Sequence, residues 1–240
     1  MIHALLFAGG TGRRMQSGGT PKQFLSVFGK PIIVYTVEHF EYHPEIDDIC
    51  IVCLEAFIPK LRHLLESYGI KKVLDVIPGG ETSQASIWNG LSYLNDKFKS
   101  REDIVLIHDG VRPLIDDTLI SQNIASVKQN GNAITVVRAT ETFCTVTNNQ
   151  IDTVLPRQNC VIARAPQSFF LNDIVNAHKW AQINHVTDTI DSCDLTKRYG
   201  KPLYFVESSS TNIKITYPID FYFFKSILDA RESEQVIGLT

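Results

Sequence analysis

Short apolar runs alternate along the chain with longer segments in which apolar residues recur every three or four positions. The runs predict buried strands at residues 2–8, 47–54, 71–77, 103–109 and 132–139. The periodic segments predict helices at residues 31–42, 57–69, 82–98 and 116–129. Alternation of this kind is typical of parallel strands joined by right-handed crossovers, with helices on both faces. The pattern therefore predicts an α/β fold with a doubly wound, mostly parallel sheet.

The rhythm changes after residue 139, where two short β-rich runs flank Asn148 and Asn149. An Asn pair favours a turn, so the segment at about 140–158 predicts a β-hairpin arm that projects from the sheet. Helices at residues 170–183 and 191–200, a strand at 202–208 and a last helix from Pro218 complete the pattern. No linker divides the chain, and we expect one domain over residues 1–240. Since a two-stranded arm is marginal alone, we expect it to pack on a second subunit in a homodimer.

Charge and hydropathy argue against several classes of partner. The chain has 240 residues, with 23 basic and 26 acidic side chains and a formal net charge of −3. No overall positive field attracts nucleic acid or an anionic membrane surface. There is also no apolar run as long as a membrane span, about 20 residues, and no signal-peptide pattern. We therefore expect a cytoplasmic protein without membrane or nucleic-acid partners.

Five cysteines are scattered along the chain, which fits a reduced compartment better than a disulfide framework. Cys50 and Cys53 form a C-x-x-C, but they lie within the predicted strand at 47–54. Residues three apart in a strand point to opposite faces of the sheet, which is unsuitable for a shared metal. We therefore expect both cysteines to be buried core residues.

A glycine-rich segment, AGGTGRRM, follows the first predicted strand. Ligands of α/β proteins bind at the carboxyl ends of parallel strands, where glycines let backbone N–H groups approach an anion. The segment lacks the G-x-x-x-x-G-K-[ST] of a Walker A loop. It also departs from the dinucleotide fingerprint, because Met15 replaces the third glycine and the nearest strand-end acid, Glu55, is too distant. With Arg13, Arg14 and Lys22 close by, the loop favours phosphate binding over solvated surface charge.

Several motifs in order along the chain resemble those of the cytidylyltransferases that act on polyol phosphates. They are AGGTGRRM, PKQF, the Gly79-Gly80 pair, HDGVRP, APQSF and NIKIT. The family has one branch for 2-C-methyl-D-erythritol 4-phosphate and another for D-ribitol 5-phosphate. The resemblance implies a Rossmann-like nucleotidyltransferase that joins CTP to a polyol phosphate and releases pyrophosphate. The attacking phosphate oxygen is already ionised at neutral pH, so this chemistry needs positioning and positive charge rather than a general base.

The resemblance also implies roles for individual residues. Arg14, Lys22 and Lys214 match residues expected on the triphosphate and on the charge that develops at the α-phosphate, and they are the predicted catalytic residues. From the residues alone, Lys214 is better explained as a sheet-edge charge. The implied nucleotide-binding residues are Ala8, Gly9, Gly10, Thr11, Gly12, Arg13, Gly79, Gly80, Ser86 and Asp109.

Asp109 and Arg112 end an apolar strand abruptly in charge. A carboxylate at this edge suits Mg²⁺, which prefers oxygen and usually takes one or two carboxylates together with phosphates, so Asp109 is the expected metal ligand. For the polyol phosphate, the resemblance implies Arg112 together with Thr142 and Arg157 from the arm of a partner subunit. His108 is expected to be a core or supporting residue.

Two positions depart from the family pattern. Ser83 stands where arginine is frequent and affects a nucleotide contact, and Ala165 stands where threonine is frequent and affects a substrate hydrogen bond. Asp191 matches a family aspartate without an assigned role.

The segment around HDGVRP and the Asn89-Gly90 pair look closer to the ribitol-phosphate branch. D-ribitol 5-phosphate is therefore the leading substrate, and 2-C-methyl-D-erythritol 4-phosphate of isoprenoid synthesis is the alternative. An NAD-dependent oxidoreductase and a non-catalytic nucleotide-binding regulator stay open as other classes.

Overall fold

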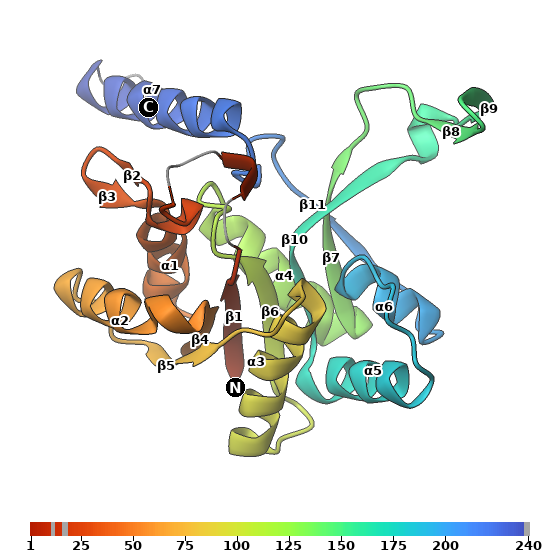
Figure 1. Cartoon of the computed structure of the whole chain (residues 1–240), viewed down its shortest axis with the longest axis horizontal. Coiled ribbons are helices and arrows are strands. Elements are labelled where there is room, and N and C mark those ends of the chain that lie inside the picture. Colours follow the sequence, from red (N-terminus) through yellow and green to blue (C-terminus); the bar gives the residue numbers. More distant parts are fainter. Residues whose placement is uncertain (11–12, 16–18, 238–240) are drawn as a thin grey trace.

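A mixed β-sheet forms the centre of the computed structural model, which describes residues 1–10, 13–15 and 19–237, with the backbone alone for residue 13 and residues 234–237. In this part of the chain the sheet has seven strands, in the order β11-β7-β10-β6-β1-β4-β5 (Figure 1). They are β1 (Ile2–Ala8), β4 (Asp48–Cys53), β5 (Val73–Pro78), β6 (Ile104–Asp109), β7 (Asn132–Arg138), β10 (Val161–Phe170) and β11 (Phe205–Glu207). Neighbouring strands are parallel except at β10, which is antiparallel to both β6 and β7.

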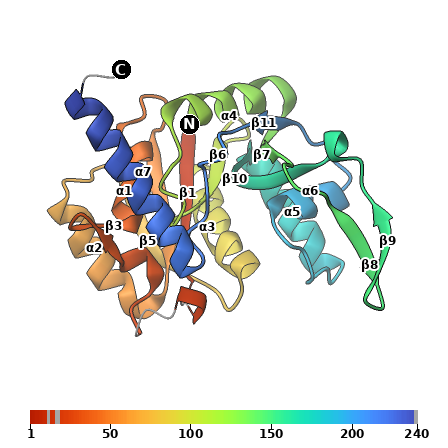
Figure 2. The ribbon, with the colours of Figure 1, turned by 90° about the horizontal axis from the view of Figure 1, so that it is seen from above.

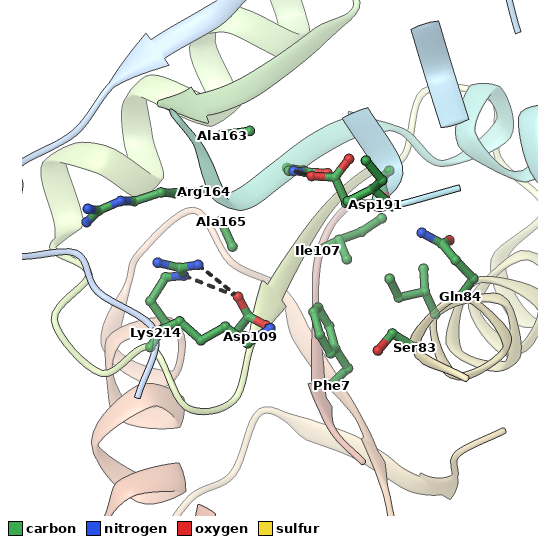
Figure 3. A pocket seen from close by; sticks show the side chains of 15 residues that line it. Phe7, Ser83, Gln84, Ile107, Asp109, Ala163, Arg164, Ala165, Asp191 and Lys214 are labelled. Carbon is green, nitrogen blue, oxygen red and sulfur yellow. Dashed lines mark hydrogen bonds and ion pairs between the residues drawn. The ribbon is translucent and has the colours of Figure 1, made fainter. Parts of the chain in front are cut away.

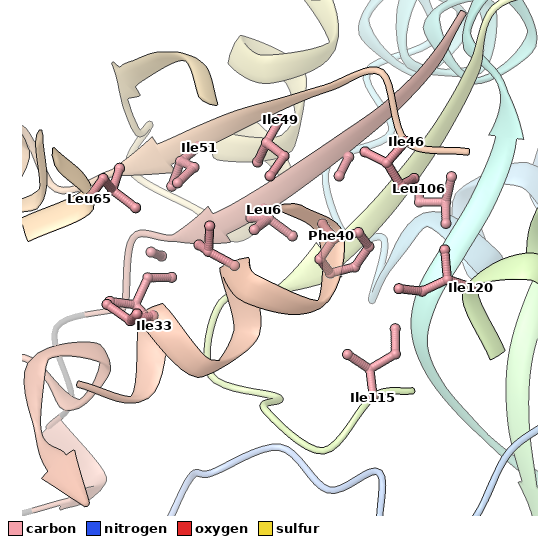
Figure 4. Close-up of a cluster of buried hydrophobic side chains, with 14 of the residues drawn as sticks. Leu6, Ile33, Phe40, Ile46, Ile49, Ile51, Leu65, Leu106, Ile115 and Ile120 are labelled. Carbon is pink, nitrogen blue, oxygen red and sulfur yellow. The ribbon is translucent and has the colours of Figure 1, made fainter. Parts of the chain in front are cut away.

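Helices cover both faces of this sheet (Figures 1 and 2). They are α1 (Ile32–Tyr42), α2 (Ile58–Ser67), α3 (Ser83–Phe98), α4 (Asp117–Asn130), α5 (Leu171–Ile183), α6 (Ser192–Arg198) and, beyond them, α7 (Pro218–Ile237). Alternate residues of β1 separate the two faces, since Leu6 belongs to one buried cluster and Leu5 to the other. The first cluster packs α1, α2 and α4 on the sheet (Figure 4), and the second packs α3, α5 and α6. The predicted doubly wound, mostly parallel sheet is confirmed.

Local sequence explains where the helices that frame the carboxyl edge begin. Thr82 caps α3 by accepting from the Ala85 N–H at 3.1 Å, and Asp116 caps α4 by accepting from the Leu119 N–H at 2.8 Å. The first four N–H groups of a helix lack partners within the helix, so caps of this kind stabilise its start. Both helices therefore begin a few residues beyond the carboxyl ends of β5 and β6.

The projecting arm is a hairpin of β8 (Cys144–Thr147) and β9 (Gln150–Val154). Its turn residues, Asn148 and Asn149, have φ angles of 51° and 64°, a left-handed conformation that Asn tolerates. The hairpin extends away from the sheet, and the side chains of both strands are exposed (Figures 1 and 2). The predicted arm is confirmed.

The two neighbouring cysteines lie in the core, as predicted. Cys50 packs in the cluster with α3 and Cys53 in the cluster with α1, on opposite faces of β4. Burial raises the pKa of Cys50 to about 12 and that of Cys53 to about 11, so both remain thiols rather than metal-binding thiolates. Among the helices that the structure describes, none is both long and apolar enough to cross a membrane.

Three segments differ from the sequence prediction. The strand β10 was not predicted, and it contains the APQSF motif. The strand predicted at 202–208 is only β11, three residues long. The NIKIT segment is not a strand, so Lys214 does not lie on a sheet edge. Short elements complete the described chain: the 3₁₀ helices η1 (Arg13–Met15), η2 (Lys22–Phe24), η3 (Glu55–Phe57) and η4 (Arg157–Asn159), and a ladder of β2 (Ser26–Val27) with β3 (Lys30–Pro31).

Candidate active site

The carboxyl ends of β1 and β6 lie side by side, because Phe7 pairs with Asp109 in the parallel ladder. The chain leaves β1 at Gly9 and leaves β6 at Gly110. A Cβ at Gly110 would lie 2.7 Å from Ile33 Cδ1 and 3.3 Å from the Phe7 carbonyl oxygen, so glycine allows the close packing seen here. Two adjoining cavities open at this edge, and Phe7 and Ser83 line both of them.

The first cavity, called the glycine cavity, has a volume of about 370 Å³. Its lining residues are Phe7, Gly9, Gly10, Gly80, Glu81, Thr82, Ser83 and Ser86. Ser86 Oγ accepts from the Gly80 N–H at 3.0 Å and donates to the Thr82 carbonyl at 2.9 Å, which fixes the turn before α3. A Cβ on Gly80 would lie 2.5 Å from Ala85 Cβ, so a larger residue does not fit. Glycine backbone from the segments after β1 and β5 therefore lines the cavity, which suits a ligand that is read by backbone groups.

Four of the ten predicted nucleotide-binding residues line this cavity, and Asp109 lines the neighbouring cavity instead. Gly9, Gly10, Gly80 and Ser86 line it directly. Ala8 and Gly79 stand just behind, where the Ala8 carbonyl accepts from Gln23 Nε2 at 2.6 Å and the Gly79 N–H donates to Cys53 at 2.8 Å. Thr11 and Gly12 lie outside the described residues, and Arg13 is described only by its backbone.

Lys22 reaches from η2 toward the same edge and is 8% exposed. Its Nζ donates to the Ile215 carbonyl at 2.7 Å, and a Cβ on Gly10 would lie 3.8 Å from its Cε. Burial, followed by the positive charges of Lys214 and Arg14, lowers the pKa of Lys22 to about 8, although Asp109 and Asp220 act in the opposite direction. The three predicted catalytic cations are therefore close enough to influence one another.

Asp109 lies among cations at the end of β6 (Figure 3). Its Oδ1 is 2.5 Å from Lys214 Nζ, and its Oδ2 accepts from Arg112 Nε at 3.2 Å. Burial alone would raise the pKa of this carboxyl, but Lys214 and then Arg112 hold it at about 2. Asp109 therefore stays ionised and positions both cations.

His108 and Arg14 complete the surroundings of this cluster. His108 is buried, and its Nε2 lies 3.1 Å from the Arg112 carbonyl. Burial, followed by the charge of Arg112, lowers the pKa of His108 to about 3, so the ring is neutral, and its burial fits the expected core position. Arg14 is exposed, with its guanidinium carbon 5.6 Å from the centre of the Tyr217 ring.

The second cavity, called the Asp109 cavity, has a volume of about 240 Å³. Its charged lining includes Lys214, Arg112 and Arg164, and Arg112 and Arg164 both donate to the Asn212 carbonyl, at 2.7 Å and 2.6 Å. Ala165, one of the two departures from the family pattern, is part of an apolar wall with Phe7 and others. Polar side chains on the far side are Gln84, Gln167, Asp191 and Ser192.

Sequence reasoning missed Arg164, Gln84 and Gln167 as lining residues. Arg164 and Gln167 lie on β10, which was not recognised as a strand, although both adjoin the Ala165-Pro166 motif. Gln84 lies in the first turn of α3, one residue after the other departure, Ser83. Their nearness to these motifs was the available signal.

Thr142 and Arg157 lie on the arm and line neither cavity. Arg157 is exposed, and its Nη1 donates to the Thr140 carbonyl at 3.2 Å. The arm projects away from the central sheet (Figure 1), and one chain does not bring these two residues into the lining of its own cavities. Their predicted role depends on a partner subunit and stays a prediction.

A magnesium site can be tested against the side chains at this edge. In the described part of the chain, no group of three or more His, Cys, Asp or Glu side chains is placed to hold a metal. Asp109 is the carboxylate next to the cations, and Mg²⁺ commonly takes one carboxylate together with nucleotide phosphates. The residues fit a metal ion that the nucleotide brings with it, and they do not fit a metal held by protein side chains alone.

Known proteins resemble this chain over nearly its whole length. The family model of 2-C-methyl-D-erythritol 4-phosphate cytidylyltransferase matches residues 2–230. A ribitol-5-phosphate cytidylyltransferase from Vibrio parahaemolyticus is 50% identical and spans 98% of this chain and 99% of the relative. One from Streptococcus agalactiae is 46% identical and spans 98% of both chains. The structure of 4-diphosphocytidyl-2C-methyl-D-erythritol synthase from Anaerococcus prevotii has the same fold, with a TM-score of 0.83 at 23% identity over 95% of this chain and 96% of that one.

Proposed function

Because this chain belongs to the 2-C-methyl-D-erythritol 4-phosphate cytidylyltransferase family, we propose that it joins CTP to D-ribitol 5-phosphate. The products are CDP-ribitol and pyrophosphate. The choice of polyol rests on the two similar proteins that are named ribitol-5-phosphate cytidylyltransferases. It agrees with the branch that the sequence motifs favour.

One observation carries this proposal: positive charge is in excess between two adjoining cavities. Lys22, Lys214 and Arg112 gather near one carboxylate, Asp109. Two phosphorylated molecules repel each other, and cations at their meeting point reduce that repulsion. We assign the glycine cavity to the cytidine nucleotide and the Asp109 cavity to the polyol phosphate.

For the nucleotide, we assign recognition of cytosine to backbone groups of Ala8, Gly9, Gly79 and Gly80. Such groups read the amino and carbonyl edge of a base without a side chain, and Ser86 holds their turn in place. Around the triphosphate we place Lys22 together with the loop residues Gly10, Thr11, Gly12, Arg13 and Arg14.

The proposed reaction forms one bond and breaks one bond. An ionised oxygen of the polyol phosphate attacks the α-phosphorus of CTP, while the bond from that phosphorus to the bridging oxygen of the β-phosphate breaks. The electron pair of that bond leaves with pyrophosphate. No general base is needed, because the second pKa of a phosphate monoester is about 6. Lys22 and Lys214 stabilise the charge that grows on the α-phosphate, and Asp109 positions Lys214 and Arg112.

Mg²⁺ is the proposed cofactor, with Asp109 as its protein ligand. When bound, the ion neutralises part of the triphosphate charge and favours departure of pyrophosphate. Asp109 is suited to this role because its low pKa keeps it ionised at every physiological pH.

The arm is the proposed dimer contact. Its exposed side chains include Val146, Ile151 and Val154, which are apolar and typical of a surface that packs on another subunit. In such a homodimer Thr142 and Arg157 of each arm would contact the polyol phosphate in the partner's site, alongside Arg112.

A single assay tests the proposed function. The protein is incubated with CTP, Mg²⁺ and one of three acceptors, D-ribitol 5-phosphate, 2-C-methyl-D-erythritol 4-phosphate or glycerol phosphate, and pyrophosphate release is measured. We expect the highest kcat/KM with ribitol 5-phosphate. Preference for methylerythritol phosphate would move the chain to the other branch. CTP binding without product from any acceptor would favour a nucleotide-binding regulator, and tight NADH binding would revive the oxidoreductase.

A further inference from the structure

The two sides of the Asp109 cavity differ in chemistry (Figure 3). Lys214, Asp109 and Arg164 lie on one side, which is rich in cations. Gln84 and Asp191 lie on the other, with Ile107 and Phe7 between the two sides. A ligand that spans this cavity therefore meets positive charge at one end and hydrogen-bonding groups at the other.

Two side chains on the hydrogen-bonding side have no hydrogen-bond partner in the described part of the chain. The side-chain Nε2 and Oε1 of Gln84 are both buried, and neither has a partner there. The same holds for Oγ of Ser192, a residue that is 1% exposed. Buried polar groups are normally paired, and leaving one unpaired is costly, so each exception calls for an explanation.

The neighbouring polar groups already form hydrogen bonds that stabilise the start of α6. Gln167 Nε2 donates to Asp191 Oδ2 at 2.8 Å, and Gln167 Oε1 accepts from the Cys193 N–H at 2.9 Å. Asp191 Oδ1 accepts from the Asp194 N–H at 2.9 Å and caps the helix. This gives Asp191 a structural role, and it leaves Gln84 and Ser192 as the lining side chains here with buried polar atoms that have no partner in the described part of the chain.

The unused groups match a hydroxylated ligand rather than a second anion. A carboxamide offers a donor and an acceptor, and a serine hydroxyl offers both, so together they complement neighbouring alcohol groups, which also donate and accept. An anion would leave the acceptor Oε1 of Gln84 unpaired. A phosphate is better placed at the side with Lys214, Arg112 and Arg164.

We propose that Gln84 and Ser192 are specificity-determining residues that bind hydroxyl groups of the polyol chain, whose phosphate lies at the cationic side. This assignment rests on the proposed function. It orients the acceptor with its phosphate beside Lys214 and Lys22, where the α-phosphorus of CTP must be, and with its alcohol groups extending toward α3 and α6. It also accounts for the two buried groups without protein partners.

The variants Gln84→Leu and Ser192→Ala test the assignment, with Gln122→Leu on the exposed face of α4 as the matched control. In Gln84→Leu, kcat/KM for ribitol 5-phosphate should fall by about 10- to 100-fold, while KM for CTP stays unchanged. Ser192→Ala should act in the same direction with a smaller loss. The ratio of kcat/KM for ribitol 5-phosphate to that for glycerol phosphate, which has fewer hydroxyl groups, should fall in both variants.

Thermal unfolding separates ligand binding from a structural role. Removing an unpaired buried group should leave the melting temperature the same or raise it, whereas removing a structural group should lower it. If the wild type turns over normally and Gln84→Leu has the same kcat/KM for ribitol 5-phosphate, this inference alone is overturned. A lower melting temperature with a matching loss for every acceptor and for CTP would also overturn it. Lack of pyrophosphate from the wild type with all acceptors would overturn the proposed function, and this inference with it.

Discussion

The strands β1 and β6 carry buried charge at both ends, and the two ends are built differently. At the amino end, His3 Nδ1 lies 2.8 Å from Asp48 Oδ1, and the Asp103 carboxylate accepts from the Met1 ammonium at 2.6 Å. At the carboxyl end, Asp109 is the partner of both Lys214 and Arg112. Lys22 and Arg14 add further positive charge near them.

The difference lies in the balance of charge. At the amino end, Asp48 lies beside His3, and Asp103 lies beside both the Met1 ammonium and His3. None of these residues lines either cavity of the candidate site. The carboxyl end gathers more cations than its one central carboxylate can neutralise, beside two cavities. Charge that is balanced within the chain stabilises the fold, whereas surplus charge of one sign is stabilised by a ligand of the other sign.

The largest expected effect comes from removing one cation from the surplus of positive charge at the carboxyl end. Lys22→Met removes a buried cation while keeping an unbranched side chain of similar length. We expect kcat with CTP and ribitol 5-phosphate to fall on the order of 10²- to 10³-fold, because a cation at the developing charge is lost. The melting temperature should change little, because relief of the desolvation and of the repulsion from Lys214 and Arg14 opposes the loss of the hydrogen bond to the Ile215 carbonyl. Steady-state kinetics and calorimetry measure the two effects.

Lys179→Met is the matched control, because Lys179 is an exposed cation on α5. It should leave both kcat and the melting temperature unchanged. Equal turnover in Lys22→Met and the wild type would remove Lys22 from the site and would make the two ends of the sheet equivalent.

The opposite pattern is expected at the amino end. Asp103→Asn removes a carboxylate, 2% exposed as a residue, that accepts from the Met1 ammonium and lies 3.6 Å from His3 Nε2. The free energy of unfolding should fall by about 2 kcal/mol, as for loss of a charged hydrogen bond in a buried setting. The kcat/KM values should not change, since this group is remote from both cavities. Urea unfolding measures this loss in Asp103→Asn and in the control Glu102→Gln, whose side chain is exposed. An equal loss of unfolding free energy in both variants would contradict the prediction.

The site at the carboxyl end of the sheet was predictable from groups that are close together in the chain. Asp109 was recognisable because an apolar run stops abruptly at a charge, and Lys22 because it follows a glycine loop. The contact between Asp109 and Lys214 joins segments far apart in sequence, and only the family resemblance pointed to Lys214. Gln84 was missed although it adjoins Ser83, because a glutamine in the first turn of a helix ordinarily faces solvent.

The strand β10 shows the same limit for the fold. Its sequence, VIARAPQSFF, contains a proline and mixes polar with apolar positions, and proline within a run argues against a central strand. The ladder between β10 and β7 tolerates it through a register shift between Ala163 and Gln167, on either side of Pro166. Pairing with β6 and β7 on both sides outweighs local preference, and this cannot be read from the segment alone.

The pH dependence compares activity and stability through a single group, Lys22. The pKa of Lys22, which faces Lys214, Arg14, Asp109 and Asp220, is lowered to about 8. Its charge is therefore lost as pH rises through about 8, and kcat/KM for CTP, which reports the free enzyme, should fall about tenfold per pH unit above that value. The kcat profile should turn down at higher pH, because the bound triphosphate favours the charged lysine.

Stability should move in the opposite direction over the same range. Between about 8 and the ordinary value of 10.5, the unfolded chain binds more protons at this lysine than the folded chain does, so its contribution to the free energy of unfolding rises with pH. The Lys22→Arg variant keeps its charge, because an arginine stays protonated, and should lose the alkaline fall in kcat/KM even if its rate is lower. If kcat/KM falls at alkaline pH in Lys22→Arg as it does in the wild type, the fall belongs to another group. Lys22 then does not supply the charge that CTP meets.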